Sequence, residues 1–125
     1  MEESHGRFYL KLTDSKNLIG EFSNNNCNGN YTESADLDPQ EPKPDDGKFS
    51  GYYYSTWHDD CNRKHTAVIT KLKIEKKSDC EDIFRLTWSD VTNGQMRFQG
   101  AGILCDGTLI GDYHPAPLQN PSIPN

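Results

Sequence analysis

Alternation of apolar and polar residues with a period of two runs through most of the chain and limits its fold more than any other feature. In residues 7–13, Phe8, Leu10 and Leu12 alternate with more polar neighbours. Such alternation is typical of strands with one face in a core and the other in solvent. The same pattern recurs in residues 17–22, 48–57, 66–76, 82–89, 95–105 and 108–113. No stretch shows the 3.6-residue apolar spacing of an amphipathic helix, so the sequence predicts an all-β protein.

The order of these segments predicts a closed antiparallel up-and-down barrel of about eight strands. Short turn sequences such as Asn93-Gly94 and Asp106-Gly107 separate them and favour type I′ hairpins. Residues 29–34 supply the eighth strand if they are extended. Eight strands in meander order can close and remove the exposed edges, and glycines within the strands permit the bending that closure needs. A two-layer β-sandwich is the alternative.

Polar residues are concentrated outside this pattern. The chain has 125 residues and a net charge of −6, and residues 23–47 hold six acidic side chains against one lysine. That segment is also rich in Asn and Pro, a composition that does not order itself by burial. We therefore expect a single β-barrel domain at 1–113 with an acidic loop at 35–47, followed by a Pro-rich extended tail at 114–125.

The charge balance and the absence of motifs exclude several functions. A pI near 5.1 makes nucleic acid a poor partner, and no apolar run approaches the length of a membrane span. No nucleophile elbow, phosphate-binding loop or metalloprotease motif is present. The His-rich segment 58–65 lacks a recognised metal-ligand spacing. These observations favour a non-enzymatic protein without a metal or cofactor over an enzyme.

Aromatic side chains are the strongest functional signal. Strand alternation places five of them on inward faces, where they form a candidate ligand-binding set: Tyr53, Trp57, Trp88, Phe98 and Tyr113. They either line a cavity or fill the barrel interior. Tyr52 and Tyr54 face outward and form a candidate interaction surface for a glycan or a protein partner, unless they pack beneath a neighbouring segment.

Three sequence blocks resemble avidin-type and lipocalin-type barrels: residues 47–52, 84–88 and 98–104. The resemblance covers residues 7–113 and implies a small, largely apolar ligand held in the barrel mouth. It does not imply biotin, because the side chains that hold biotin in avidins have no counterparts that can be placed here. The lipocalin Gly-x-Trp signature is also absent, since Gly6-Arg7-Phe8 carries Phe in place of Trp.

The four cysteines suggest disulfides. Cys27, Cys61 and Cys80 have polar neighbours, which is unusual for buried free thiols. In an eight-strand meander the loops with Cys27 and Cys61 share one end of the barrel, and Cys80 and Cys105 share the other. We therefore predict Cys27–Cys61 and Cys80–Cys105, one of three possible connectivities. With the glycosylation sequon at residues 30–32, this favours a secreted protein over a cytoplasmic one.

Two functions follow from the sequence. The first is a non-enzymatic protein that binds a small hydrophobic or amphipathic ligand in a barrel cavity. The alternative is a carbohydrate- or protein-interaction module that uses the exposed tyrosines and the acidic loop. The oligomeric state does not follow from the sequence.

Overall fold

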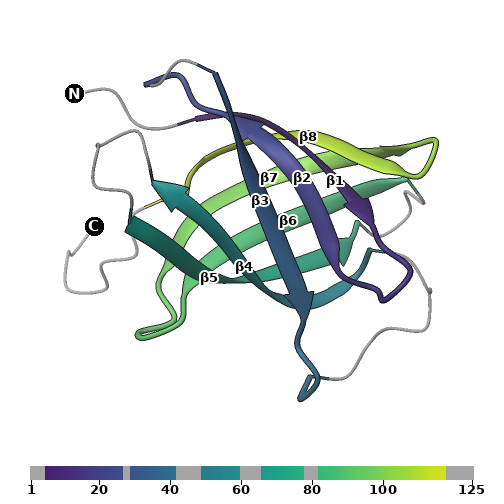
Figure 1. Ribbon diagram of the computed structural model, residues 1–125, viewed down its shortest axis with the longest axis horizontal. Helices are drawn as coiled ribbons and strands as arrows, with labels where there is room; N and C mark the ends of the chain where they lie inside the picture. Colours follow the sequence, from purple (N-terminus) through teal and green to yellow (C-terminus); the bar gives the residue numbers. More distant parts are fainter. Residues whose placement is uncertain (1–4, 27–28, 42–48, 60–65, 78–81, 118–125) are drawn as a thin grey trace, which may run out of the picture.

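Eight antiparallel strands form one closed barrel in the computed structural model of the protein (Figure 1). The structure describes residues 5–26, 29–41, 49–59, 66–77 and 82–117. The strands are β1 (Gly6–Leu12), β2 (Leu18–Ser23), β3 (Asn30–Leu37), β4 (Gly51–Asp59), β5 (Thr66–Lys76), β6 (Ile83–Asp90), β7 (Met96–Cys105) and β8 (Thr108–Pro115). The prediction of an all-β, closed up-and-down barrel is confirmed, and the sandwich alternative is wrong.

Pairing between the first and last strands closes the barrel. Each strand pairs with its neighbours in sequence, and β1 also pairs with β8 from Gly6↔Tyr113 to Lys11↔Thr108. A closed sheet leaves no unpaired edge to recruit a strand from another molecule. Among the described residues, no helix is long and apolar enough to cross a membrane.

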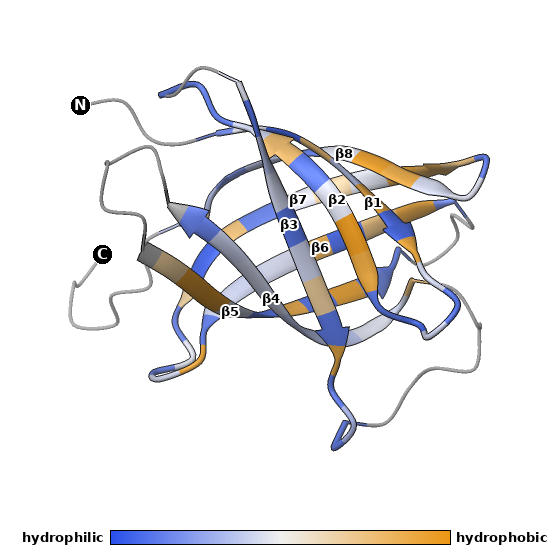
Figure 2. Ribbon diagram, viewed as in Figure 1, coloured by the Kyte–Doolittle hydropathy of each residue, from blue (hydrophilic) through white to orange (hydrophobic). Residues whose placement is uncertain are grey.

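The period-two pattern of the sequence separates side chains that face the barrel interior from side chains that face outward. Along β1, Phe8 and Leu10 are buried while Tyr9 is half-buried and Lys11 is exposed. Figure 2 shows that hydropathy changes repeatedly along single strands. The inward side chains make one core, and its largest fully buried members include Tyr53, Phe84, Leu10, Leu18, Leu72, Ile74, Leu86 and Leu109.

One end of the barrel is filled with side chains. Phe49, which precedes β4, is 3% exposed and packs edge-on against Phe84, with ring centroids 6.4 Å apart. The Tyr53 hydroxyl donates a hydrogen bond to the Phe49 carbonyl oxygen at 2.7 Å. This end, where the connections β1–β2, β3–β4, β5–β6 and β7–β8 lie, is therefore closed by the chain itself.

Two boundaries differ from those expected. β3 continues to Leu37, so residues 35–37, which composition placed in the acidic loop, belong to a strand. The reason is that Ala35 is a buried core residue and Leu37 packs on that core, so burial outweighs the acidic character of Asp36 between them. β8 likewise extends to Pro115, two residues beyond the expected end of the barrel.

Candidate functional site

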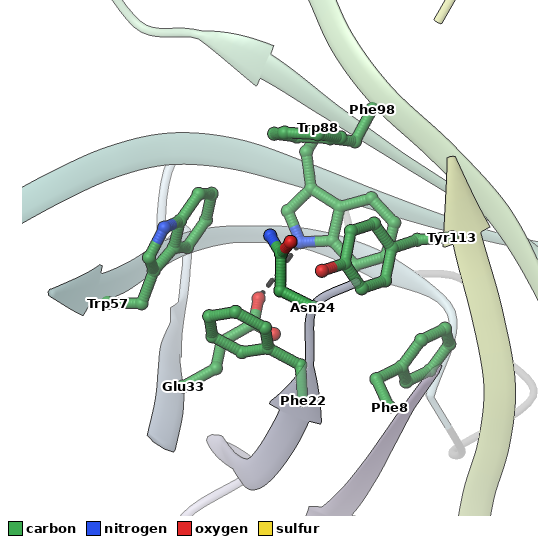
Figure 3. A pocket seen from close by; sticks show the side chains of 8 residues that line it. All are labelled: Phe8, Phe22, Asn24, Glu33, Trp57, Trp88, Phe98 and Tyr113. Atoms are coloured by element: carbon green, nitrogen blue, oxygen red, sulfur yellow. Dashed lines mark hydrogen bonds between the residues drawn. The ribbon is translucent and has the colours of Figure 1, made fainter. Parts of the chain in front are cut away.

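The opposite end of the barrel contains a cavity. It has a volume of about 50 Å³ and is lined by Phe8, Phe22, Asn24, Glu33, Trp57, Trp88, Phe98 and Tyr113 (Figure 3). Most of these residues lie where β1 and β7 begin and where β2, β4, β6 and β8 approach their ends. In an antiparallel meander these strand ends meet at one end of the barrel, which we call the mouth.

The cavity has a buried floor and a more accessible rim. Phe8, Glu33, Trp88 and Tyr113 are buried, whereas the other four lining residues are half-buried. Glu33 lies in the middle of β3 and is 3% exposed. It faces inward because its strand neighbours Ala35 and Leu37 share its side of β3 and pack in or on the core.

The Glu33 carboxyl group is held by two hydrogen bonds to the same oxygen. The Ser55 hydroxyl donates to Glu33 Oε2 at 2.5 Å, and Trp88 Nε1–H donates to it at 2.9 Å. Burial raises the pKa of Glu33 above its ordinary value, and these two hydrogen bonds oppose the rise because they favour the carboxylate. None of the ion pairs formed within the described parts of the chain includes Glu33.

A second buried hydroxyl lies beside Ser55. Thr70 on β5 stands directly opposite Ser55 in the β4–β5 register and is fully buried. Its Oγ1 has no hydrogen-bond partner within the part of the chain that the structure describes. The interior next to Glu33 therefore contains two buried hydroxyl groups, those of Ser55 and Thr70.

Aromatic rings surround the carboxyl group. Phe22 lies 6.0 Å from Trp57 and 6.1 Å from Tyr113 between ring centroids. Phe98 lies 6.5 Å from Trp57 and 5.6 Å from Tyr113, so these four rings form a closed circuit. All four contacts are edge-to-face, the arrangement in which the positive edge of one ring meets the negative face of the next. The circuit fixes the ring positions at the mouth.

Tyr113 joins this circuit to the barrel wall. Its hydroxyl donates to the carbonyl oxygen of Ser23 at 2.8 Å, which ties β8 to the end of β2. Burial raises the pKa of Tyr113 to about 12, and the negative charge of Glu33 acts in the same direction. A hydrogen bond with Asn24 opposes this rise. The phenol therefore stays neutral at any physiological pH and offers a hydroxyl dipole to the cavity.

Four of the five side chains that the sequence placed in the ligand-binding set are brought together. Trp57, Trp88, Phe98 and Tyr113 all line the cavity. Tyr53 does not: it is fully buried toward the closed end, where its hydroxyl serves the Phe49 carbonyl. Ligand binding by these residues stays a prediction.

Sequence reasoning missed Phe8, Phe22, Asn24 and Glu33 as lining residues. Phe8 and Phe22 lie in segments that alternate, but nothing local distinguishes a ring at the mouth from one in the core. Glu33 did carry a signal. It lies two residues before Ala35 and four before Leu37, so strand alternation puts a carboxyl group on an inward face.

The outward tyrosines lie in a shallow groove over β4, β5 and β6. The Lys71 ammonium sits 5.4 Å from the Tyr52 ring centroid and 5.8 Å from that of Tyr54, which are cation–π distances. Lys71 also pairs with Asp38 at 3.2 Å and with Glu41 at 3.3 Å. The beginning of the acidic loop is thus bound to this surface, and Tyr54 remains 42% exposed.

The structure does not confirm the predicted disulfides. Cys105 is a free and exposed cysteine, which does not support its pairing with Cys80. Cys27, Cys61 and Cys80 lie outside the described residues. Within the described ranges no group of three or more His, Cys, Asp or Glu side chains is placed to hold a metal ion. His58 is exposed near the end of β4, and residues 60–65 of the His-rich segment are not described.

The fold and the cavity together define a small closed β-barrel with an aromatic mouth. No protein-family model matches the chain, and comparison with curated proteins and with solved structures gave no match.

Proposed function

We propose that the protein is a non-enzymatic binding protein that holds a small hydrophobic or amphipathic ligand in the barrel mouth. The observation that carries the proposal is the contrast between the two ends of the barrel. One end is filled by Phe49 and its neighbours, whereas the other keeps a cavity walled by six aromatic side chains. Apolar walls with a few polar groups are the usual composition of small-molecule sites.

The general manner of binding follows that of avidin-type and lipocalin-type barrels, which the sequence blocks resemble. In such barrels the sheet is a rigid frame and the ligand enters at one end. The aromatic circuit supports this proposal here, because rigid rings lose little conformational entropy when a ligand packs against them. The ligand class that we propose is defined by the cavity and does not include biotin.

Both tryptophans of the chain line the cavity, so intrinsic fluorescence reports on it directly. We expect 2-phenylethanol or phenethylamine to change this fluorescence saturably, with a dissociation constant on the order of 1 mM for a ligand of this size. Replacement of Phe98 by Ala keeps both tryptophans and should weaken binding at least about fivefold, because one wall of the cavity is lost.

The matched control is Ile69→Ala, since Ile69 is 51% exposed on the outside of β5 and should not affect binding. Native mass spectrometry of the purified protein complements the titration by detecting a carried ligand. Failure of both probes to bind, together with no carried ligand, would contradict the proposal.

A second candidate function uses the outer surface around Tyr52 and Tyr54. It is supported by the exposed Tyr54 ring and by the groove that runs from it to Val91 and Gly94. Lys71 lies over both tyrosine rings, which makes stacking on a sugar less favourable than binding in the mouth. The double variant Tyr52→Ala/Tyr54→Ala should abolish binding on a glycan or protein array if this surface is used.

A further inference from the structure

Glu33 indicates the chemical group that the cavity takes, and this inference rests on the proposed function. A buried carboxylate needs a compensating positive charge or several hydrogen bonds. Oε2 of Glu33 accepts hydrogen bonds from Ser55 and Trp88, but both donors are neutral. The described residues form no ion pair with it. The cavity therefore contains a carboxyl group for which the described part of the barrel supplies no counter-charge.

The surrounding rings favour the same kind of partner. Figure 3 shows the Phe22, Trp57, Trp88, Phe98 and Tyr113 side chains around the space beside the Glu33 carboxyl group. Aromatic faces are electron-rich, so they attract a cation and repel an anion. An anionic ligand would meet the carboxylate and the ring faces together, and a purely apolar ligand would leave the carboxylate unpaired in a drier site.

The size of the cavity limits how much of the ligand can enter. Its volume of about 50 Å³ is roughly a third of the 150 Å³ of an apolar cavity that admits benzene. A protonated amine on a short carbon stem fits such a space, whereas a whole aromatic molecule does not. The rest of the ligand would lie against the half-buried rings of Phe22, Trp57 and Phe98 at the rim.

We propose that the cavity binds the protonated amine of an organic cation, with Glu33 as its counter-ion and the mouth aromatics as its cage. The ammonium group donates hydrogen bonds to the carboxylate, and its adjoining methylenes contact the rings. The apolar body of the ligand covers the mouth and excludes water from the ion pair. A free amine and the side chain of a lysine both present this chemistry.

Proton linkage gives the proposal a distinctive signature. Burial raises the pKa of Glu33 in the free protein, and a bound ammonium lowers it, so binding below the raised pKa releases a proton. The affinity for an amine should therefore increase with pH until Glu33 is ionised in the free protein. Tyr113 is the other titratable side chain among the lining residues, and with a pKa of about 12 it does not titrate in this range.

The experiment compares three probes of one shape: phenethylamine, 2-phenylethanol and 3-phenylpropanoate, which are cationic, neutral and anionic. We expect the wild-type protein to bind the amine at least about tenfold more tightly than the alcohol, and the anion more weakly than both. In Glu33→Gln the preference for the amine should fall below about threefold while the alcohol still binds, which shows that the cavity is intact. The control Glu75→Gln removes a half-buried acid that pairs with Lys73 on the outside of β5, and it should keep the preference.

The outcomes separate this inference from the proposed function. If the alcohol binds as tightly as the amine, or if Glu33→Gln keeps the preference, the amine inference is wrong while ligand binding stands. If no probe binds the wild-type protein and no carried ligand is detected, the proposed function fails and the inference fails with it. A further probe, Nα-acetyl-lysine methylamide, distinguishes the sources: tighter binding than phenethylamine indicates a lysine side chain, and weaker binding indicates a free amine.

Discussion

Glu33 is the residue at which a cost to folding and the proposed ligand specificity coincide. Its carboxyl group occupies a core position that an apolar side chain would fill at lower cost. Ser55 and Trp88 orient the carboxyl group through hydrogen bonds. Its remaining capacity to accept hydrogen bonds faces the cavity that Glu33 lines. A residue that is unfavourable for folding and well oriented for binding is typical of a functional position.

Glu33→Gln tests the folding cost separately from binding. The pKa of Glu33 is raised in the folded state above its ordinary value of 4.5. The stabilising contribution of Glu33 to the unfolding free energy is therefore complete below pH 4.5, and it is lost as the pH rises through the folded-state pKa. Over that interval the wild-type protein loses up to about 1.4 kcal/mol per pH unit, and the variant does not. We therefore expect the stability advantage of the variant to grow from pH 4.5 and then level off.

Urea denaturation of both proteins between pH 4.5 and pH 8 measures this difference. Gln keeps an oxygen that can accept from Ser55 and Trp88, so the substitution preserves the shape of the site. A difference in unfolding free energy that does not change with pH would show that Glu33 does not titrate as proposed.

At the residue scale, the sequence predicted the aromatic lining better than the polar centre. Trp57, Trp88, Phe98 and Tyr113 face inward because strand alternation is a local property that the sequence displays. Tyr53 shares that alternation but lies toward the filled end, and its position depends on Phe49 folding back over the barrel. Glu33 was counted among the acids of the polar segment 23–47, because the Asn-rich stretch before it and the acidic residues after it obscured the strand.

Strands and turns were predicted more completely. Seven strands lie where alternation placed them, with ends shifted by a few residues, and the strand expected conditionally at residues 29–34 is β3 (Asn30–Leu37). The Asp106-Gly107 turn is a two-residue hairpin with positive φ at both positions, 51° and 80°, as a type I′ turn requires. Asn93-Gly94 was predicted to form the same turn and does not. Only Gly94 has positive φ, and the Asn93 side chain instead accepts a hydrogen bond from the Gln95 amide within a longer loop.

Close approach of β7 and β8 yields a prediction at this scale. A Cβ atom added at Gly111 would lie 2.0 Å from the carbonyl oxygen of Ala101, a backbone atom that cannot move without separating the two strands. We expect Gly111→Ala to lower the unfolding free energy by about 3 kcal/mol. Ala67→Val, which adds methyl groups at an exposed position of β5, should change it by less than about 0.5 kcal/mol. Thermal unfolding of the two variants checks the difference, and a Gly111→Ala protein of wild-type stability would refute the argument.

Closure of the barrel is a property of the whole molecule that alternation alone could not decide. A sandwich and a barrel share the same inward and outward pattern, and they differ in whether β1 meets β8, about a hundred residues away along the chain. Glycines within the strands favoured the barrel because they allow sharp bending. The long-range pairing itself leaves no local mark in the sequence.

Hydrogen exchange can verify closure in solution. If β1 and β8 pair as in the structure, the amides at the middle of β1 should exchange as slowly as those of β4 and β5, because none belongs to an edge strand. Exchange measured by NMR gives this comparison residue by residue. Rapid exchange confined to β1 and β8 would indicate that the barrel opens at this seam.

The even number of strands has a practical consequence for experiments. In an eight-strand meander β1 starts, and β8 finishes, at the same end as the mouth, and Figure 1 shows the start of β1 and the end of β8 on the same side of the barrel. A fusion partner, an affinity tag or a sensor surface joined just before β1 or just after β8 therefore sits beside the site where a ligand would arrive. Attachment through the β7–β8 turn at the filled end leaves that approach clear, so the choice of immobilisation point will decide whether a binding measurement reports on the cavity or on its obstruction.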